Sequence, residues 1–139
     1  MKKWMFILLI LMSMMNDVTA QNADDLFMIE NATKAPSGHN TQPWLFKMKD
    51  AEIDIYPNFS EELPVVDPLH RELFVSLGCA TENLCIAAQQ KGYQTEVRIT
   101  NDSVIRVLLT KDEKAPCSSF LFPQIALRQT NRSVYNGED

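Results

Sequence analysis

The chain has 139 residues, a formal net charge of −5 at pH 7 and a hydrophobic share of 45%. This length and composition indicate one ordinary globular domain and exclude the disordered and fibrous classes. Because the chain is acidic and has no run of lysines and arginines, nucleic acid is not expected as a partner.

The N-terminus has the pattern of a cleavable signal peptide. Lys2 and Lys3 precede an apolar run over residues 4–15, and a secretory signal joins a positive start to an apolar stretch of about 7–15 residues. Val18 and Ala20 provide the small residues that signal peptidase accepts, so we predict cleavage after Ala20. The alternative is an uncleaved membrane anchor, which needs about 20 apolar residues, more than this run contains.

Residues 1–20 are therefore predicted to be removed, and residues 21–139 to form the mature domain. No cysteine directly follows the predicted cleavage site, and the twin-arginine pattern is absent. We expect export by the general secretory route to the periplasm or the medium. No stable membrane anchor is expected to remain after cleavage.

The mature domain is predicted to begin with a helix over residues 23–34. Apolar residues recur at near-helical spacing, and two aspartates occupy the first turn, where they favour the helix dipole. The apolar positions are Leu26, Phe27, Ile29 and Ala32. Residues 35–43 are rich in residue types that interrupt periodic structure, which predicts a loop that contacts another group.

Alternating apolar and polar residues predict a β-hairpin after this loop. Its strands are expected at residues 44–49 and 53–56, and Pro57 ends the second strand. Residues 58–68 are expected to be an irregular connection, because a proline lies in the middle of the segment.

A long core helix is predicted over residues 69–90. Its apolar residues repeat at intervals of three and four, which marks one buried helix face. These residues are Leu73, Leu77, Ala80, Leu84 and Ala87. Asp67 is expected to act as an acidic cap at the start of this helix, and Gly92 occupies a C-cap position after it.

The remaining segments complete an α+β pattern. A second hairpin is predicted from residues 94–99 and 104–110, joined by a turn at residues 101–103. A short helix is expected over residues 122–128, with Pro123 in its first turn. The fold class predicted from these elements is α+β, with a long core helix, flanking helices and short antiparallel strands.

Three cysteines lie in the mature part, where an oxidising compartment would allow two of them to pair. Cys79 and Cys85 are six residues apart on the predicted helix, so their side chains point in different directions and no bridge is expected between them. Buried, apolar cysteines are the default expectation, including Cys117. His39 and His70 do not combine with the cysteines in metal-ligand spacing, so no metal site is expected.

Polar side chains are concentrated in the loop at residues 35–43. Asn40 and Gln42 each offer a donor and an acceptor, which suits the edge of a flat polar heterocycle, and backbone beside Gly38 allows close approach. The alternative is that Ser37, Asn40 and Gly38 only form turns.

The segment 35–44 resembles the A-P-S-x-x-N-x-Q-P-W signature of the nitroreductase-like FMN oxidoreductases. The resemblance implies that Ser37, Asn40 and Gln42 contact the flavin. FMN is therefore the expected cofactor, and a nitroreductase-like fold is expected.

Further blocks at residues 66–72, 76–84 and 128–132 resemble the duplicated, Acg-type branch of this family. The last block is similar to an R-x-S-x-R element, which implies that Arg128, Thr130 and Arg132 help to hold the FMN phosphate or ribityl chain. Guanidinium groups suit phosphate oxygens. The alternative is a charged helix terminus.

In the duplicated branch this last element opens a second half, so the resemblance covers an N-terminal half only. We therefore expect an incomplete nitroreductase-like fold. Either the chain is a truncated product, or a partner chain completes the flavin site; a homodimer is one form of such a partner.

The resemblance implies an oxidoreductase that passes electrons from a donor such as NAD(P)H through FMN to a nitroaromatic or quinone-like acceptor. FMN carries that chemistry, so no catalytic acid or base is assigned to the chain. The alternatives are a protein that binds or sequesters FMN without turnover, and a nonfunctional truncated fragment.

Overall fold

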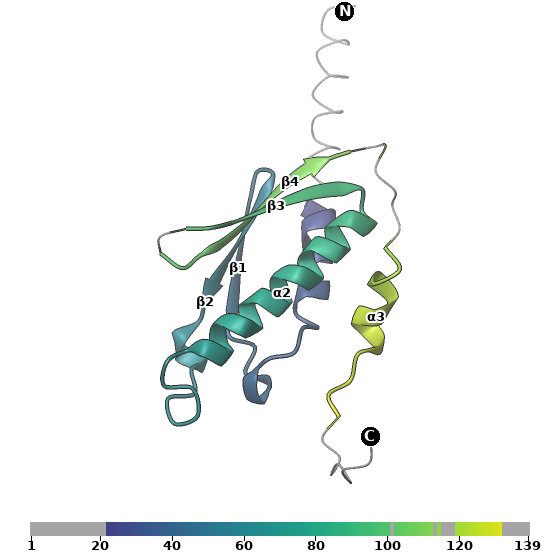
Figure 1. Ribbon diagram of the computed structural model, residues 1–139. Helices are drawn as coiled ribbons and strands as arrows, with labels where there is room; N and C mark the ends of the chain where they lie inside the picture. The colour runs from purple at the N-terminus through teal and green to yellow at the C-terminus, as the bar shows by residue number, and fades with distance from the viewer. Residues whose placement is uncertain (1–21, 101, 113, 115–118, 132–139) are drawn as a thin grey trace, which may run out of the picture.

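The structure, a computed structural model, describes residues 22–100, 102–112, 114 and 119–131. Within them the chain forms three α-helices and one four-stranded antiparallel sheet (Figure 1), which confirms the α+β class. The predicted signal peptide at residues 1–20 lies outside the described residues, and so do Cys117 and Arg132.

The first helix covers described residues 22–32 and ends two residues earlier than predicted. Its last turn tightens, because the N–H groups of Lys34 and Ala35 bond to carbonyls three residues back, and Pro36 follows. The expected apolar face was partly wrong. Met28 and Ala32 are fully buried, whereas Leu26 is 58% exposed.

The four strands have the lengths expected from the sequence to within one or two residues. They are β1 (Trp44–Lys49), β2 (Glu52–Pro57), β3 (Tyr93–Ile99) and β4 (Ile105–Lys111). The two predicted hairpins do not stay separate, because β2 pairs with β4 and gives the order β1-β2-β4-β3.

The strand register separates an apolar face of the sheet from a charged one. Ile53 lies opposite Val107, and the side chains of both are fully buried. Asp54, one residue further along β2, lies opposite Arg106 on the other face. A shift by one residue would exchange these two faces, so the apolar pattern fixes the register.

The connection after β2 contains a short 3₁₀ turn that the sequence did not predict. This turn, η2, covers Phe59–Glu61. The Asn58 side chain accepts a hydrogen bond from the Ser60 backbone N–H at 3.3 Å, which stabilises its start.

Helix α2 runs from Arg71 to Gln90 and begins two residues later than predicted. His70 has a left-handed backbone with φ 55°, so regular helix cannot start before it. The expected acidic cap is confirmed: Asp67 Oδ2 accepts the Leu73 N–H at 2.9 Å. Burial raises the pKa of Asp67, but the N–H groups at the start of α2 outweigh that effect and lower it overall.

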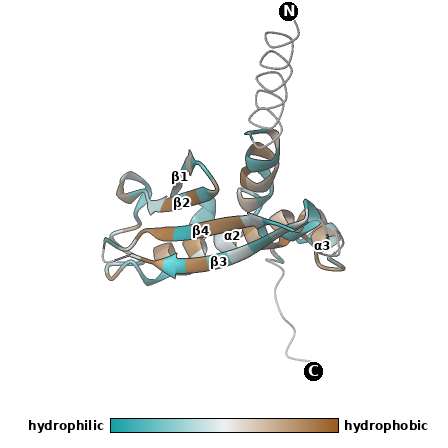
Figure 2. Ribbon diagram, turned by 90° about the horizontal axis from the view of Figure 1, so that it is seen from above, coloured by the Kyte–Doolittle hydropathy of each residue, from teal (hydrophilic) through white to brown (hydrophobic). Residues whose placement is uncertain are grey.

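The predicted apolar face of α2 is buried against β2, β3 and β4. Viewed from above, α2 lies beneath β3 and β4, and the hydrophobic stretch of β4 lies over it (Figure 2). All five residues predicted for this face are at most 4% exposed: Leu73, Leu77, Ala80, Leu84 and Ala87.

Helix α3 covers Phe122–Leu127 and has Pro123 in its first turn, as predicted, while Arg128 forms its C-cap. Ile125 is buried, and the Phe122 ring stacks on Phe27 of the first helix with centroids 5.5 Å apart. Figure 1 shows α3 on the far side of α2 from β1 and β2. This packing brings α3 into contact with the first helix.

Cys79 and Cys85 are free thiols, as the helical spacing predicted. Both are half-buried rather than fully buried, so the expectation of inaccessible cysteines was only partly correct. Among the described residues, no helix combines the length and apolar character needed to cross a membrane.

Candidate ligand-binding cleft

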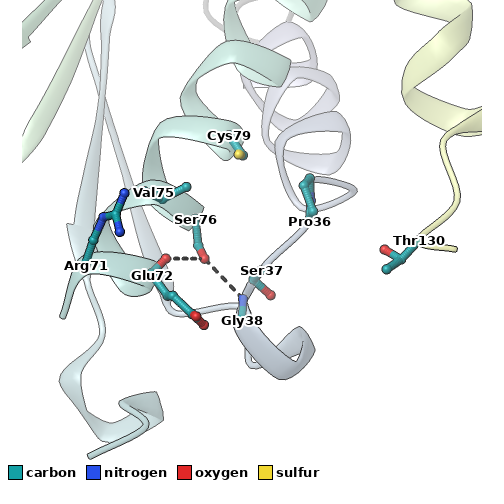
Figure 3. A pocket seen from close by; sticks show the side chains of 9 residues that line it. All are labelled: Pro36, Ser37, Gly38, Arg71, Glu72, Val75, Ser76, Cys79 and Thr130. Atoms are coloured by element: carbon teal, nitrogen blue, oxygen red, sulfur yellow. Dashed lines mark hydrogen bonds between the residues drawn. The ribbon is translucent and has the colours of Figure 1, made fainter. Parts of the chain in front are cut away.

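A cleft of about 400 Å³ lies where three segments of the chain meet. The turn after the first helix forms one wall, the N-terminal half of α2 forms the second, and the segment after α3 faces them (Figure 3). The lining residues are Pro36, Ser37, Gly38, Arg71, Glu72, Val75, Ser76, Cys79 and Thr130.

Arg128 links the segment after α3 to the turn after the first helix. Its guanidinium donates to the Lys34 carbonyl at 3.2 Å and to Thr130 Oγ1 at 3.1 Å. Arg128 and Lys34 are 94 residues apart in the sequence. This bridge holds Thr130 opposite α2, where its side chain lines the cleft (Figure 3).

The loop that carries Ser37 is closed by its own hydrogen bonds. The Ser37 hydroxyl accepts the Gln42 N–H at 3.0 Å, and the Ser37 carbonyl accepts the Asn40 N–H at 3.0 Å. The short 3₁₀ turn η1 (Gly38–Asn40) lies between these bonds. The turn-forming role that the sequence left open is therefore real for Ser37.

Three residues of this loop have a left-handed backbone without being glycine. They are His39 with φ 48°, Asn40 with φ 60° and Gln42 with φ 52°. Asparagine tolerates this region, but each such residue costs on the order of 1–3 kcal/mol when no local bond compensates. Such strain persists only where surrounding structure holds it, and it is concentrated at functional sites in proteins.

Helix α2 holds this loop through Gly38. A Cβ atom added at Gly38 would lie 2.8 Å from Glu72 Oε2, so the loop backbone passes directly against the helix. The Gly38 N–H donates to Ser76 Oγ at 3.3 Å, and the Ser76 hydroxyl donates to the Glu72 carbonyl at 2.7 Å (Figure 3). A larger residue at this position would therefore require the Glu72 carboxylate to move.

The structure brings only part of the predicted site together. Ser37 and Thr130 line the same cleft. Asn40, Gln42 and Arg128 are exposed and do not line it. Arg132 lies outside the described residues.

Five lining residues on α2 were missed as site residues by sequence reasoning. They are Arg71, Glu72, Val75, Ser76 and Cys79. The family-like blocks at residues 66–72 and 76–84 contain four of the five, but no role was assigned to them. Their positions were a usable signal, because they border the predicted buried face of α2 on one side.

The lining combines apolar surface with a few polar groups. Pro36 and Val75 offer flat apolar contact, while Ser37 and Thr130 offer hydroxyl groups. Arg71 adds a positive charge beside the negative charge of Glu72. A largely apolar cleft with few polar groups is typical of sites for small organic ligands.

A second cavity of about 640 Å³ lies near the C-terminal half of α2, against β3. It is larger than the first, but none of the residues expected to contact FMN lines it. Burial raises the pKa of the Cys85 thiol on its wall, so its reactive thiolate is disfavoured. Within the described ranges, no three His, Cys, Asp or Glu residues are grouped to hold a metal ion.

No protein-family profile matches the chain. Over 110 residues the chain is 30% identical to two proteins from two strains of Mycobacterium tuberculosis, each named "Putative NAD(P)H nitroreductase". The chain resembles nitroreductases. The similarity covers 76% of this chain but only 32% of each relative, so the chain spans about a third of the length of the curated relatives it matches.

The similarity supports the nitroreductase-like relationship that the sequence motifs indicated. The α+β architecture is compatible with that relationship. Neither the sequence similarity nor the architecture identifies a cofactor or a substrate for this chain.

Proposed function

We propose that this chain forms part of an FMN-binding, NAD(P)H-dependent oxidoreductase and that the cleft beside α2 receives the flavin. The observation that carries this proposal is the meeting of two family-like segments, distant in sequence, at one cleft. Arg128 bonds to the Lys34 carbonyl across 94 residues, and this contact sets Thr130 opposite Ser37.

The residues of the cleft fit a flavin in size and chemistry. A volume of about 400 Å³ falls within the range of about 300–1,000 Å³ typical of ligand pockets. Pro36 and Val75 provide apolar surface for a ring, and the hydroxyls of Ser37 and Thr130 provide partners for polar edges or ribityl oxygens. Arg71 supplies a cation for a phosphate, and Arg132 is proposed to supply another.

Bound FMN supplies two-electron chemistry between a reduced nicotinamide and a nitroaromatic or quinone-like acceptor. The residues of the chain itself bind the flavin and orient it. Asn40 and Gln42, exposed beside the cleft, are proposed to contact the flavin from the loop edge. Arg128 is proposed to serve the phosphate end by holding the Thr130 segment in place, in addition to any direct contact.

The first test is a fluorescence titration of FMN with the purified full chain. Saturable quenching is expected, and Ser37→Ala and Thr130→Ala should each weaken binding roughly 3- to 10-fold, as for loss of one hydrogen bond. Thr110→Ala is the matched control, because Thr110 is an exposed hydroxyl on β4 that does not line the cleft. No binding by a folded chain, or equal losses in all three variants, would contradict the proposal.

Oxidation of NAD(P)H by the FMN-loaded chain separates the proposed enzyme from the alternatives. FMN-dependent consumption of NAD(P)H is the expected result. Binding without consumption would instead indicate an FMN-binding or sequestering protein, and a chain that neither folds nor binds would indicate a nonfunctional fragment.

Export remains part of the proposal. The charged and apolar pattern at the N-terminus supports cleavage after Ala20 and a periplasmic or secreted product. N-terminal sequencing of the protein recovered outside the cytoplasm should begin at Gln21. An intact N-terminus in a membrane fraction would support the anchor instead.

A further inference from the structure

Ser76 is a buried hydroxyl on α2 that makes two hydrogen bonds in different directions. It is 3% exposed. Its hydroxyl donates to the Glu72 carbonyl one turn back at 2.7 Å, so the hydrogen is committed within the helix. The oxygen can then accept, and it accepts the Gly38 N–H at 3.3 Å.

The group that Ser76 holds is the start of the strained loop. Gly38 directly precedes His39 and Asn40, whose backbones are both left-handed. The N–H groups of Asn40, Thr41 and Gln42 all donate to acceptors within the loop. The far end of the loop is tied to β1, because the Gln42 carbonyl accepts the Trp44 N–H at 2.8 Å. Internal bonds set the shape of a loop, but they do not fix its position on the domain.

We propose that Ser76 is a positioning residue that anchors the Ser37–Gln42 loop to α2 and so fixes Ser37 at the wall of the cleft. Helix α2 is held in place here, because the residues of the same helix face, Leu73 and Ala80, are buried in the core against the sheet. The hydrogen bond from the Gly38 N–H to Ser76 therefore restrains the position of the loop relative to α2. The functional part of this inference rests on the proposed flavin site, whereas the anchoring itself does not.

Thr81 provides a matched control on the same helix. It is also buried, at 7% exposed, and its hydroxyl donates to the Leu77 carbonyl at 2.8 Å in the same way. Among the described residues, no loop N–H donates to Thr81. Removal of either hydroxyl therefore deletes the same kind of bond within α2, and only the Ser76 change also deletes the anchor.

Amide hydrogen exchange of the full chain without flavin tests the anchor directly. Ser76→Ala should speed exchange at Gly38, Asn40, Thr41 and Gln42 by roughly 3- to 10-fold, the factor for loss of one buried hydrogen bond. Thr81→Val, which keeps the side-chain shape, should leave those amides unchanged. Ser76→Cys, similar in size but a weaker acceptor, serves if the alanine variant does not fold, and it should also speed exchange.

Unchanged loop exchange in both Ser76 variants would overturn the anchoring role. An equal increase in Thr81→Val would do the same, since the effect would then reflect helix stability. FMN titration of these variants tests the functional part: Ser76→Ala should weaken FMN binding roughly 3- to 10-fold, and Thr81→Val should not. If the wild-type chain binds no FMN, the proposed function fails while the exchange result still decides the anchor. If exchange changes but FMN affinity does not, the loop does not position the ligand.

Discussion

Asp54 is a fully buried carboxylate on the face of the sheet that α2 does not cover. Arg106 donates to its two oxygens at 2.7 and 3.0 Å, and Lys49 donates to Oδ2 at 2.6 Å. The Arg106 guanidinium holds the pKa of Asp54 well below its ordinary range, with Lys49 assisting against the effect of burial. The ion pairs of Asp54 therefore link β1, β2 and β4.

Replacing Asp54 with Asn should lower the free energy of unfolding by about 2–3 kcal/mol at neutral pH, because charge-assisted bonds in a buried position are lost. Urea denaturation measures the difference. The matched control is Glu96→Gln, which removes the carboxylate of an exposed pair with Arg98 and should change stability little. A loss as large in the control would contradict the assignment.

The wild-type chain and the Asp54→Asn variant can also be compared as a function of pH. Because the pKa of Asp54 is lower in the folded state, its stabilisation is fully present above the unfolded value near 3.8 and is lost as pH falls below it. The stability difference between wild type and Asp54→Asn should therefore shrink between about pH 5 and about pH 2. A difference that stays constant on acidification would mean that the charge of Asp54 does not carry the effect.

At the scale of elements, α2 carries both the fold and the cleft. One face of the helix is buried in the core, and the neighbouring residues line the cleft. The acidic cap at Asp67 fixes where the helix starts, and so fixes where Glu72 and Ser76 lie relative to the loop. Substitutions within α2 should therefore change the free energy of unfolding as well as ligand binding.

Gly78 is a residue that weakens α2, because glycine within a helix is less stable than alanine. It lies exposed within α2, and a Cβ atom added there would meet nothing within 4 Å among the described residues. Gly78→Ala should raise the free energy of unfolding by about 0.5–1 kcal/mol, because alanine loses less backbone freedom in a helix. Urea denaturation checks this.

Gly38→Ala is the opposing control, since its Cβ would lie 2.8 Å from Glu72 Oε2 and no gain is expected. A destabilised Gly78→Ala variant would contradict the open surface around Gly78. It would indicate that another part of the protein packs closely there.

At the scale of the whole molecule, several large apolar side chains have no cover among the described residues. Val65, Leu69 and Phe120 are 91%, 86% and 85% exposed. Apolar side chains that are exposed singly are common on protein surfaces and do not by themselves mark an interface. Completion of the flavin site by a second copy or a partner chain therefore stays a prediction.

We therefore expect self-association of the full chain to increase when FMN is added, because a ligand held by two chains stabilises their complex by mass action. Sedimentation velocity with and without FMN measures this, and riboflavin serves as a comparison that lacks the phosphate. A strictly monomeric chain that binds FMN tightly would contradict the shared site and show that the described cleft is sufficient.

Local periodicity determined most of the elements. Intervals of three and four residues located the buried face of α2 correctly, alternation located β1 and β2, and the turn at residues 101–103 marked the hairpin of β3 and β4. These features depend on residues close in sequence, whose spacing must match the helix or strand period to bury apolar surface. The motif at residues 35–44 and the block at 128–132 were visible for the same reason, as short runs of residue types.

Only the tertiary structure decided how these parts meet. The pairing of β2 with β4 and the contact of Arg128 with Lys34 both depend on long-range packing. It also placed Ser37 and Thr130 at one cleft and left Asn40 outside it. Sequence spacing cannot supply these results, because a cleft is formed by surfaces that become neighbours only after the core between them has packed.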